Sequence, residues 1–243
     1  MNDRDVEWGE AAAGLRMVSH AMVVQLLLVA MTILTLMVAL SSKTGEGVQT
    51  MAMLLAVVGL VAQIMLVTGV FKFSRQPPPQ PSSGLAQSAG ALGIVGLAIS
   101  AYVLFVLLQV SSVKPDSSYE TIESAMKAAE RLPRLEVLAA VVGFLAMVLL
   151  LAAAASAAGH LERADLVRRA RTAIAMVVLA AAIYAFIKLG VTPREEGGLV
   201  AALMMTAIVQ VAAFVNILAT VRGLAEAMLS PPPPGLPPAR TVR

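Results

Sequence analysis

The chain of 243 residues contains no cysteine. Disulfide bonds, thiolate metal ligands and cysteine nucleophiles are therefore excluded. Histidine is almost as scarce, and His160-Leu161-Glu162 is not the H-E-x-x-H pattern of a zinc protease because the second histidine is missing. We expect no catalytic residue, no cofactor and no metal site in this chain.

Charged residues and prolines are missing from the apolar parts of the chain. Asp, Glu, Lys and Arg make up 14% of the residues, against about 25% in soluble domains, and none lies in the middle of a long apolar run. All thirteen prolines also lie outside those runs. Proton relays and ion pathways usually need an ionisable group within the membrane, and many transporters use interrupted helices. The sequence therefore argues against an ion-coupled pump and predicts continuous helices.

Hydrophobic residues are what the chain has in abundance. They reach 58%, and the mean hydropathy is +0.83, as in an integral membrane protein. A helix needs about 20 apolar residues to cross about 30 Å of hydrocarbon. Because no run alternates with a period of two, we expect an all-α, polytopic membrane bundle. Its six transmembrane helices are predicted at 17–40, 50–73, 85–113, 135–158, 172–189 and 199–221.

A charged segment separates the third and fourth runs. Ser117 and Glu120 fit the S-x-x-E capping box, and Pro133 follows, so we expect a short helix over 117–132. Its apolar residues are spaced by three or four positions and form one stripe, which consists of Tyr119, Ile122, Met126 and Ala129. This spacing predicts an amphipathic helix that lies along the outer surface of the bundle.

The distribution of lysine and arginine predicts an orientation. With six spans, the two termini and the second and fourth connections share one side, which holds eleven of the 18 Lys and Arg, whereas the other side holds seven. Lys and Arg collect in cytoplasmic loops. We therefore expect a cytoplasmic N-terminal segment (1–16), a transmembrane domain (17–223) and a flexible, proline-rich cytoplasmic tail (224–243) in a bacterial-type plasma (inner) membrane.

Two groups of residues are candidates for contacts. The first can attract anionic lipid headgroups from the connection between the fourth and fifth runs, and it consists of Arg163, Arg168, Arg169 and Arg171. The second gives the third run a small-residue surface that lets two helices approach closely in lipid, and it consists of Gly90, Gly93 and Gly96. The sequence leaves open whether this second surface meets another helix of the chain or a second subunit.

These observations favour a non-catalytic membrane protein with a structural, assembly or regulatory role in a membrane complex. Neutral polar residues such as Gln25, Gln63 and Thr68 are expected to bond between helices, but they could instead line a path. A passive channel or transporter subunit for a neutral or lipid-like solute is therefore the alternative, followed by a membrane-embedded enzyme. The expected partners are the lipid bilayer and a second copy or another membrane protein, and not nucleic acid. A continuous polar path would favour the channel, and scattered polar contacts the structural role.

Overall fold

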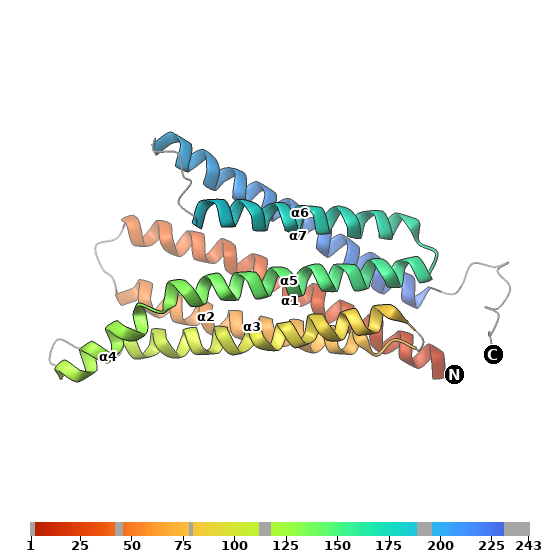
Figure 1. Ribbon diagram of the computed structural model, residues 1–243, viewed down its shortest axis with the longest axis horizontal. Helices are drawn as coiled ribbons and strands as arrows, with labels where there is room; N and C mark the ends of the chain where they lie inside the picture. Colours follow the sequence, from red (N-terminus) through yellow and green to blue (C-terminus); the bar gives the residue numbers. More distant parts are fainter. Residues whose placement is uncertain (1–2, 42–45, 78–79, 112–117, 189–195, 231–243) are drawn as a thin grey trace.

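A computed structural model describes residues 3–41, 46–77, 80–111, 118–188 and 196–230. In these residues the chain is entirely helical, as predicted, with six long helices and one short helix (Figure 1). The long helices are α1 (Asp3–Ser41), α2 (Glu46–Ser74), α3 (Pro81–Ser111), α5 (Leu132–His160), α6 (Ala164–Lys188) and α7 (Glu196–Leu229), and the short one is α4 (Tyr119–Ala129).

Among the described residues, five stretches are long and apolar enough to cross a membrane. They are Trp8–Thr32, Met53–Ser74, Pro81–Val110, Tyr119–His160, which includes both α4 and α5, and Val209–Leu229. The chain is therefore an integral multi-pass membrane protein. The first stretch begins well before the predicted residue Met17, because α1 already starts at Asp3. The described apolar part of α6 is short and follows three arginines, and α6 is not among the five.

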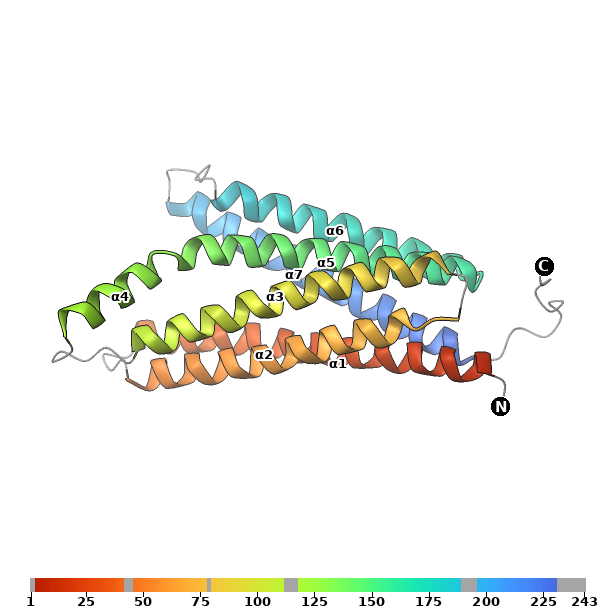
Figure 2. The same cartoon turned by 60° about the horizontal axis from the view of Figure 1, so that its bottom comes forward.

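The six long helices form a ring. Going round it, α1 contacts α2, α2 contacts α3, α3 contacts α5, α5 contacts α6, α6 contacts α7, and α7 returns to α1. Neighbouring helices run in opposite directions along the long axis of the molecule (Figures 1 and 2). The start of α1 and the end of α7 consequently lie at the same end of the bundle, which we call the core end.

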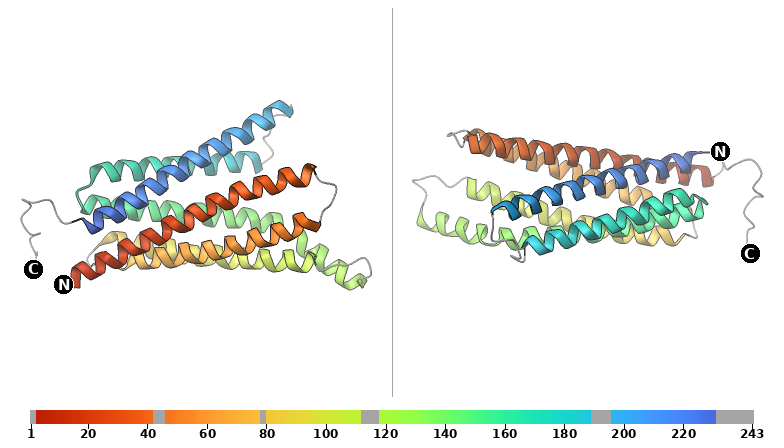
Figure 3. Two further views of the ribbon diagram at one scale, coloured as in Figure 1. Left: turned by 180° about the vertical axis from the view of Figure 1, so that it is seen from behind. Right: turned by 90° about the horizontal axis from the view of Figure 1, so that it is seen from above.

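The buried side chains gather at the core end. In α1 they run from Ala11 to Met22, and the described side chains beyond Met22 are exposed or half-buried. The cluster also takes in Val70, Phe73, Leu150, Leu151, Leu166, Val221 and Leu224. At the other end, which we call the far end, α7 diverges from α1 (Figure 3). Because lipid is as apolar as these side chains, their dense packing holds the helices together.

Two glycines mark the closest approach of α1 and α2. A Cβ atom on Gly14 would lie 2.5 Å from the carbonyl oxygen of Gly69 and 2.5 Å from the backbone nitrogen of Phe73. A Cβ atom on Gly69 would lie 2.7 Å from the carbonyl oxygen of Gly14. The obstructing atoms belong to the backbone and cannot rotate away, so only glycine fits at both positions. Sequence reasoning missed this crossing because neither glycine has a second one four residues away.

A buried polar cluster fastens the connection between α2 and α3. The Ser82 hydroxyl donates to the side-chain oxygen of Gln76 at 2.5 Å, and the Gln76 amide donates to the carbonyl oxygen of Phe73 at 3.0 Å. Gln76 is 6% exposed and Ser82 is 1% exposed. The Ser83 hydroxyl also donates to the carbonyl oxygen of Ser74 at 2.6 Å. The described ends of this proline-rich connection are therefore part of the packed core end.

The short helix α4 differs in detail from the prediction. Its N-cap is Ser118, whose hydroxyl accepts from the Thr121 backbone N–H at 3.4 Å. The predicted cap, Ser117, is one residue too early and lies outside the described residues. Pro133 does not end this helix but lies in the first turn of α5, where the missing N–H costs no helical hydrogen bond.

At the far end, α4 packs against α3 through Ala125 and Ser124, which lie beside its apolar stripe. Ala125 is 5% exposed, and the Gln109 amide on α3 donates to the Ser124 hydroxyl at 3.5 Å. Within the stripe itself, Tyr119 is 79% exposed and Met126 is 62% exposed. The helix extends beyond the neighbouring end of α3 (Figure 2), so it does not lie flat along the bundle.

Candidate anionic-lipid site between α5 and α6

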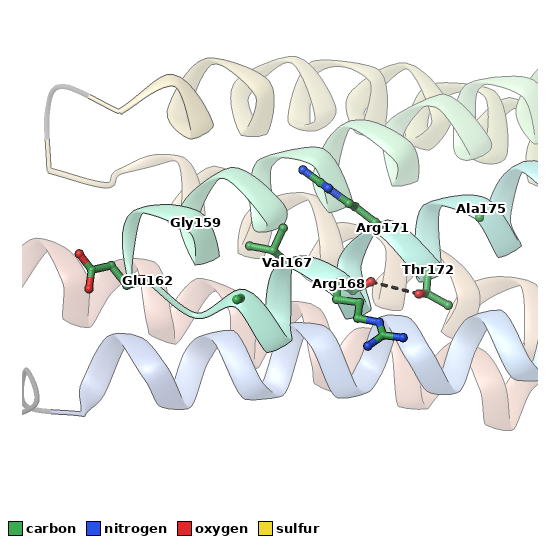
Figure 4. Close-up of a pocket in the computed structure, with 8 residues that line it drawn as sticks. Gly159, Glu162, Val167, Arg168, Arg171, Thr172 and Ala175 are labelled. Carbon is green, nitrogen blue, oxygen red and sulfur yellow. Dashed lines mark hydrogen bonds between the residues drawn. The ribbon is translucent and has the colours of Figure 1, made fainter.

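An open groove of about 800 Å³ lies where α5 ends and α6 begins (Figure 4). Residues 164, 168, 171 and 175 are three or four positions apart, so they lie on one face of α6 and form most of one wall. The lining consists of Gly159, Glu162, Ala164, Val167, Arg168, Arg171, Thr172 and Ala175. The groove therefore combines small and apolar residues with two guanidinium groups and one carboxylate.

The turn that shapes this groove ends α5 with a Schellman motif. The Glu162 N–H donates to the carbonyl oxygen of Gly159 at 3.1 Å, and the Arg163 N–H donates to that of Ala158 at 2.9 Å. Glu162 has a φ of 57°, in the left-handed region where glycine is usual. A bulky residue thus occupies a strained position at the edge of the groove.

Two of the charges near the groove neutralise each other. The Arg163 Nε atom donates to Asp165 Oδ1 at 3.0 Å, and its Nη2 atom donates to Oδ2 at 3.1 Å. The hydrogen bonds from the Arg163 guanidinium are the main cause that lowers the pKa of Asp165 below its ordinary value of 3.8. Arg163, predicted to be a lipid contact, forms this fork pairing while both side chains remain exposed, so its contact with lipid stays a prediction.

Arg168 and Arg171 are the predicted arginines that line the groove. In Figure 4 their side chains leave α6 in different directions, and Glu162 points away from both. Within the described part of the chain, neither arginine takes part in a salt bridge. The Thr172 hydroxyl donates to the backbone carbonyl oxygen of Arg168 at 3.0 Å. This bond involves the backbone of Arg168 and not its guanidinium group. Arg169 is exposed on the same helix but does not line the groove.

The turn at one end of the groove lies level with the ends of the membrane-crossing stretches. Three of those stretches end at the core end of the bundle, at Ser74, His160 and Leu229. His160 immediately precedes the turn that shapes the groove. Residues just beyond the end of a spanning helix lie at the depth of the lipid headgroups. Unpaired guanidinium groups at this depth can bind phosphate oxygens.

The predicted small-residue surface of α3 faces α2 of the same chain. Because α2 and α3 are antiparallel, successive glycines of α3 face residues of α2 that are four positions apart and decrease in number. A Cβ atom added at Gly90 would lie 2.9 Å from Phe71 Cζ, and one added at Gly93 would lie 2.8 Å from Val67 Cγ2. One added at Gly96 would lie 3.4 Å from Gln63 Nε2. This surface is therefore occupied within the chain and does not face a second subunit.

Hydroxyl and amide groups in the spans mostly bond along their own helices. The hydroxyls of Thr32, Thr68 and Thr220 each donate to the carbonyl oxygen four residues earlier, at 2.8 Å. The Asn216 amide donates to the Ala212 carbonyl oxygen at 3.0 Å and also contacts the sulfur atom of Met176 on α6 at 3.3 Å. The expected interhelical bonds are thus largely replaced by local ones, because a threonine hydroxyl reaches its own helix at lower cost.

Possible metal ligands do not converge within the described residues, where no group of three His, Asp or Glu side chains could hold an ion. His20 and His160 are both exposed.

No protein-family model matches this chain, and no match was found among curated proteins or solved structures.

Proposed function

We propose that this membrane protein is a non-catalytic structural component of a larger membrane assembly. The observation that supports this function is the scattered use of polar groups in the spans. Thr32, Thr68 and Thr220 bond to their own helices, and the hydrogen bonds described in the spans do not link into a chain between the two ends of the bundle. A channel for a polar solute would need such a path to replace the hydration of the solute.

Extraction in a mild detergent followed by mass measurement tests this proposal. We expect a stable particle much heavier than one chain of 25.3 kDa plus detergent. A second extraction in a harsh detergent, which separates subunits, provides the matched control and gives the mass of the chain alone. A single chain in the mild detergent would contradict the proposed assembly role.

We further propose that α6 is the sixth span and that the core end faces the cytoplasm of a bacterial-type inner membrane. α6 takes its place in the ring between α5 and α7, both of which contain candidate spans. The core end carries most of the described Lys and Arg, namely Arg16, Lys72, Arg75, Arg163, Arg168, Arg169, Arg171 and Arg222. The positive-inside rule places such an end in the cytoplasm.

Single cysteines report this orientation directly because the chain has none of its own. Ser118 at the far end and Ser230 at the core end are both exposed. In intact cells an impermeant thiol reagent should label Ser118→Cys and leave Ser230→Cys unlabelled until the cells are broken. The reverse pattern would overturn the orientation, and labelling of both variants in intact cells would contradict six spans.

At the core end, we propose that the groove between α5 and α6 binds an anionic phospholipid headgroup. Arg168 and Arg171 supply two unpaired positive charges, and each contributes about 1 kcal/mol near an anionic surface. Replacing both by Gln should weaken binding by about 2 kcal/mol, or roughly thirtyfold. The matched control replaces Arg169 and Arg222, which are exposed and do not line the groove.

Native mass spectrometry in nanodiscs of phosphatidylglycerol and phosphatidylcholine measures this binding. We expect retained phosphatidylglycerol on the natural protein and on the control variant, with loss from the Arg168 and Arg171 variant. Equal loss from both double variants would mean that net charge, and not the groove, retains the lipid.

A further inference from the structure

A partly open cavity of about 140 Å³ lies between α1, α2, α3 and α5. These helices are neighbours in the ring (Figure 2). Most of its lining is apolar, but the side chains of Gln25 on α1 and Gln63 on α2 also line it. Gly96 on α3 and Gly143 on α5 widen the space because they have no side chains. The cavity is separate from the arginine groove, since the two share none of the described lining residues.

The two glutamines differ from the threonines of the spans. Within the described residues, neither side-chain amide forms a hydrogen bond with the protein. An amide without a partner costs several kcal/mol in a hydrocarbon environment. Each amide offers one carbonyl acceptor and two N–H donors. Both glutamines are half-buried, so two such groups at one cavity can bind an occupant that both donates and accepts.

The depth of the cavity favours such an occupant. Gln63 lies in the middle of the spanning stretch Met53–Ser74. At about 1.5 Å per residue, it is roughly 16 Å from the end of that stretch, which is half of a hydrocarbon layer of about 30 Å. Bulk water does not reach this depth, and an amide at the interface would not need a specific partner.

We propose that this cavity is a binding site for a small uncharged amide. The volume of about 140 Å³ sets the size, because a cavity of about 150 Å³ accommodates a six-carbon ring. The carbonyl and N–H groups of a primary amide complement those of Gln25 and Gln63. Among the described residues that line the cavity none is charged, so a charged molecule of the same size would be disfavoured there. This inference rests on the unpartnered amides and does not depend on the proposed assembly role.

Binding of acetamide to the purified protein in nanodiscs tests the site. Saturation-transfer NMR measures the occupancy, with acetate as a probe of the same shape that carries a charge. Gln25→Leu/Gln63→Leu removes both hydrogen-bonding groups and keeps apolar side chains that suit the membrane. Gly143→Leu leaves both amides and fills open space at the cavity, since nothing lies within 4 Å of an added Cβ atom there.

We expect acetamide to bind the natural protein and acetate not to bind. The double glutamine variant and Gly143→Leu should each reduce the affinity for acetamide at least tenfold, whereas Gln63→Asn, which keeps an amide, should retain part of it. If the double variant does not fold, Gly143→Leu decides the question. Equal acetamide binding in all variants, or a natural protein in which only water contacts the two amides, would overturn the proposal.

Discussion

Replacing Gly14 by alanine provides the sharpest test of how α1 and α2 pack. The new methyl group would lie 2.5 Å from the Gly69 carbonyl oxygen and 2.8 Å from Lys72 Cβ. Ordinary contact begins near 3.4 Å, so the two helices must separate locally by about 0.9 Å. Rotation of a side chain cannot relieve this overlap because the nearest atoms belong to the backbone of α2.

The cost of this separation has two parts. Overpacking a dense core typically costs about 1–3 kcal/mol. A gap of 0.5–1 Å also removes about a quarter to a half of each dispersion contact across it. Leu15, Val18 and Phe73 are fully buried beside the crossing, and a loss of about 1 kcal/mol for each is of the right order. The helix preference for alanine returns about 1 kcal/mol, so we expect a net destabilisation of about 3–5 kcal/mol.

Reversible unfolding of the purified protein in mixed micelles, followed by circular dichroism, measures this change. Gly143→Ala is the matched control because an alanine Cβ at position 143 would meet nothing within 4 Å. We expect this control to be neutral or more stable by up to about 1 kcal/mol. If Gly14→Ala and Gly143→Ala unfold within about 0.5 kcal/mol of each other, the close crossing of α1 and α2 is wrong.

Three further substitutions test local features by the same unfolding measurement. Ser82→Ala leaves a buried amide oxygen without its donor and should cost about 1–3 kcal/mol, whereas the exposed control Ser88→Ala should change stability by less than about 0.5 kcal/mol; equal effects would contradict a polar cluster at the α2–α3 connection. Glu162→Gly removes left-handed strain and should stabilise the protein by about 0.5–1 kcal/mol, and a loss of stability would show that the glutamate makes a compensating contact. The pKa of Asp165 is lowered by the hydrogen bonds from Arg163, so the stability that Asp165 contributes is fully present above pH 3.8 and is lost as the pH falls through its lower pKa in the folded protein. Asp165→Asn should remove this loss of stability in acid. An unchanged dependence of stability on pH in that variant would refute the prediction.

Composition and periodicity predicted the class of fold but not its closest contacts. The apolar runs gave the long helices, since a length of about 20 residues is a direct physical requirement for crossing a membrane. They did not predict the start of α1 at Asp3, because the charges near the N-terminus hid residues that pack at the core end. The S-x-x-E pattern placed the cap of α4 one residue too early, because adjacent serines at 117 and 118 can both serve as a cap.

The arginines of the candidate lipid site could be recognised from the sequence, but their contacts could not. Four arginines in one connection indicated contacts with anionic lipid, but the sequence could not tell which of them would be paired. The fork geometry between Arg163 and Asp165 depends on a turn whose left-handed residue is Glu162, and glutamate gives no signal for that conformation. The cavity beside Gln25 and Gln63 depends on four helices at once, so no local pattern predicts it.

The close packing of α1, α2 and α3 depends on glycine residues, which have no side chains. In lipid, helices gain little from hiding apolar surface, so their association depends on how closely the backbones approach. Gly14 and Gly69 allow that approach at the core end, and the glycines of α3 continue it along α2. Polar groups that bond along their own helices add no preference for one neighbour over another. The close packing of α1, α2 and α3 is therefore set by positions at which side chains are absent, and Gly93, Gly96 and Gly143 line the cavity in which Gln25 and Gln63 remain without partners from the described residues.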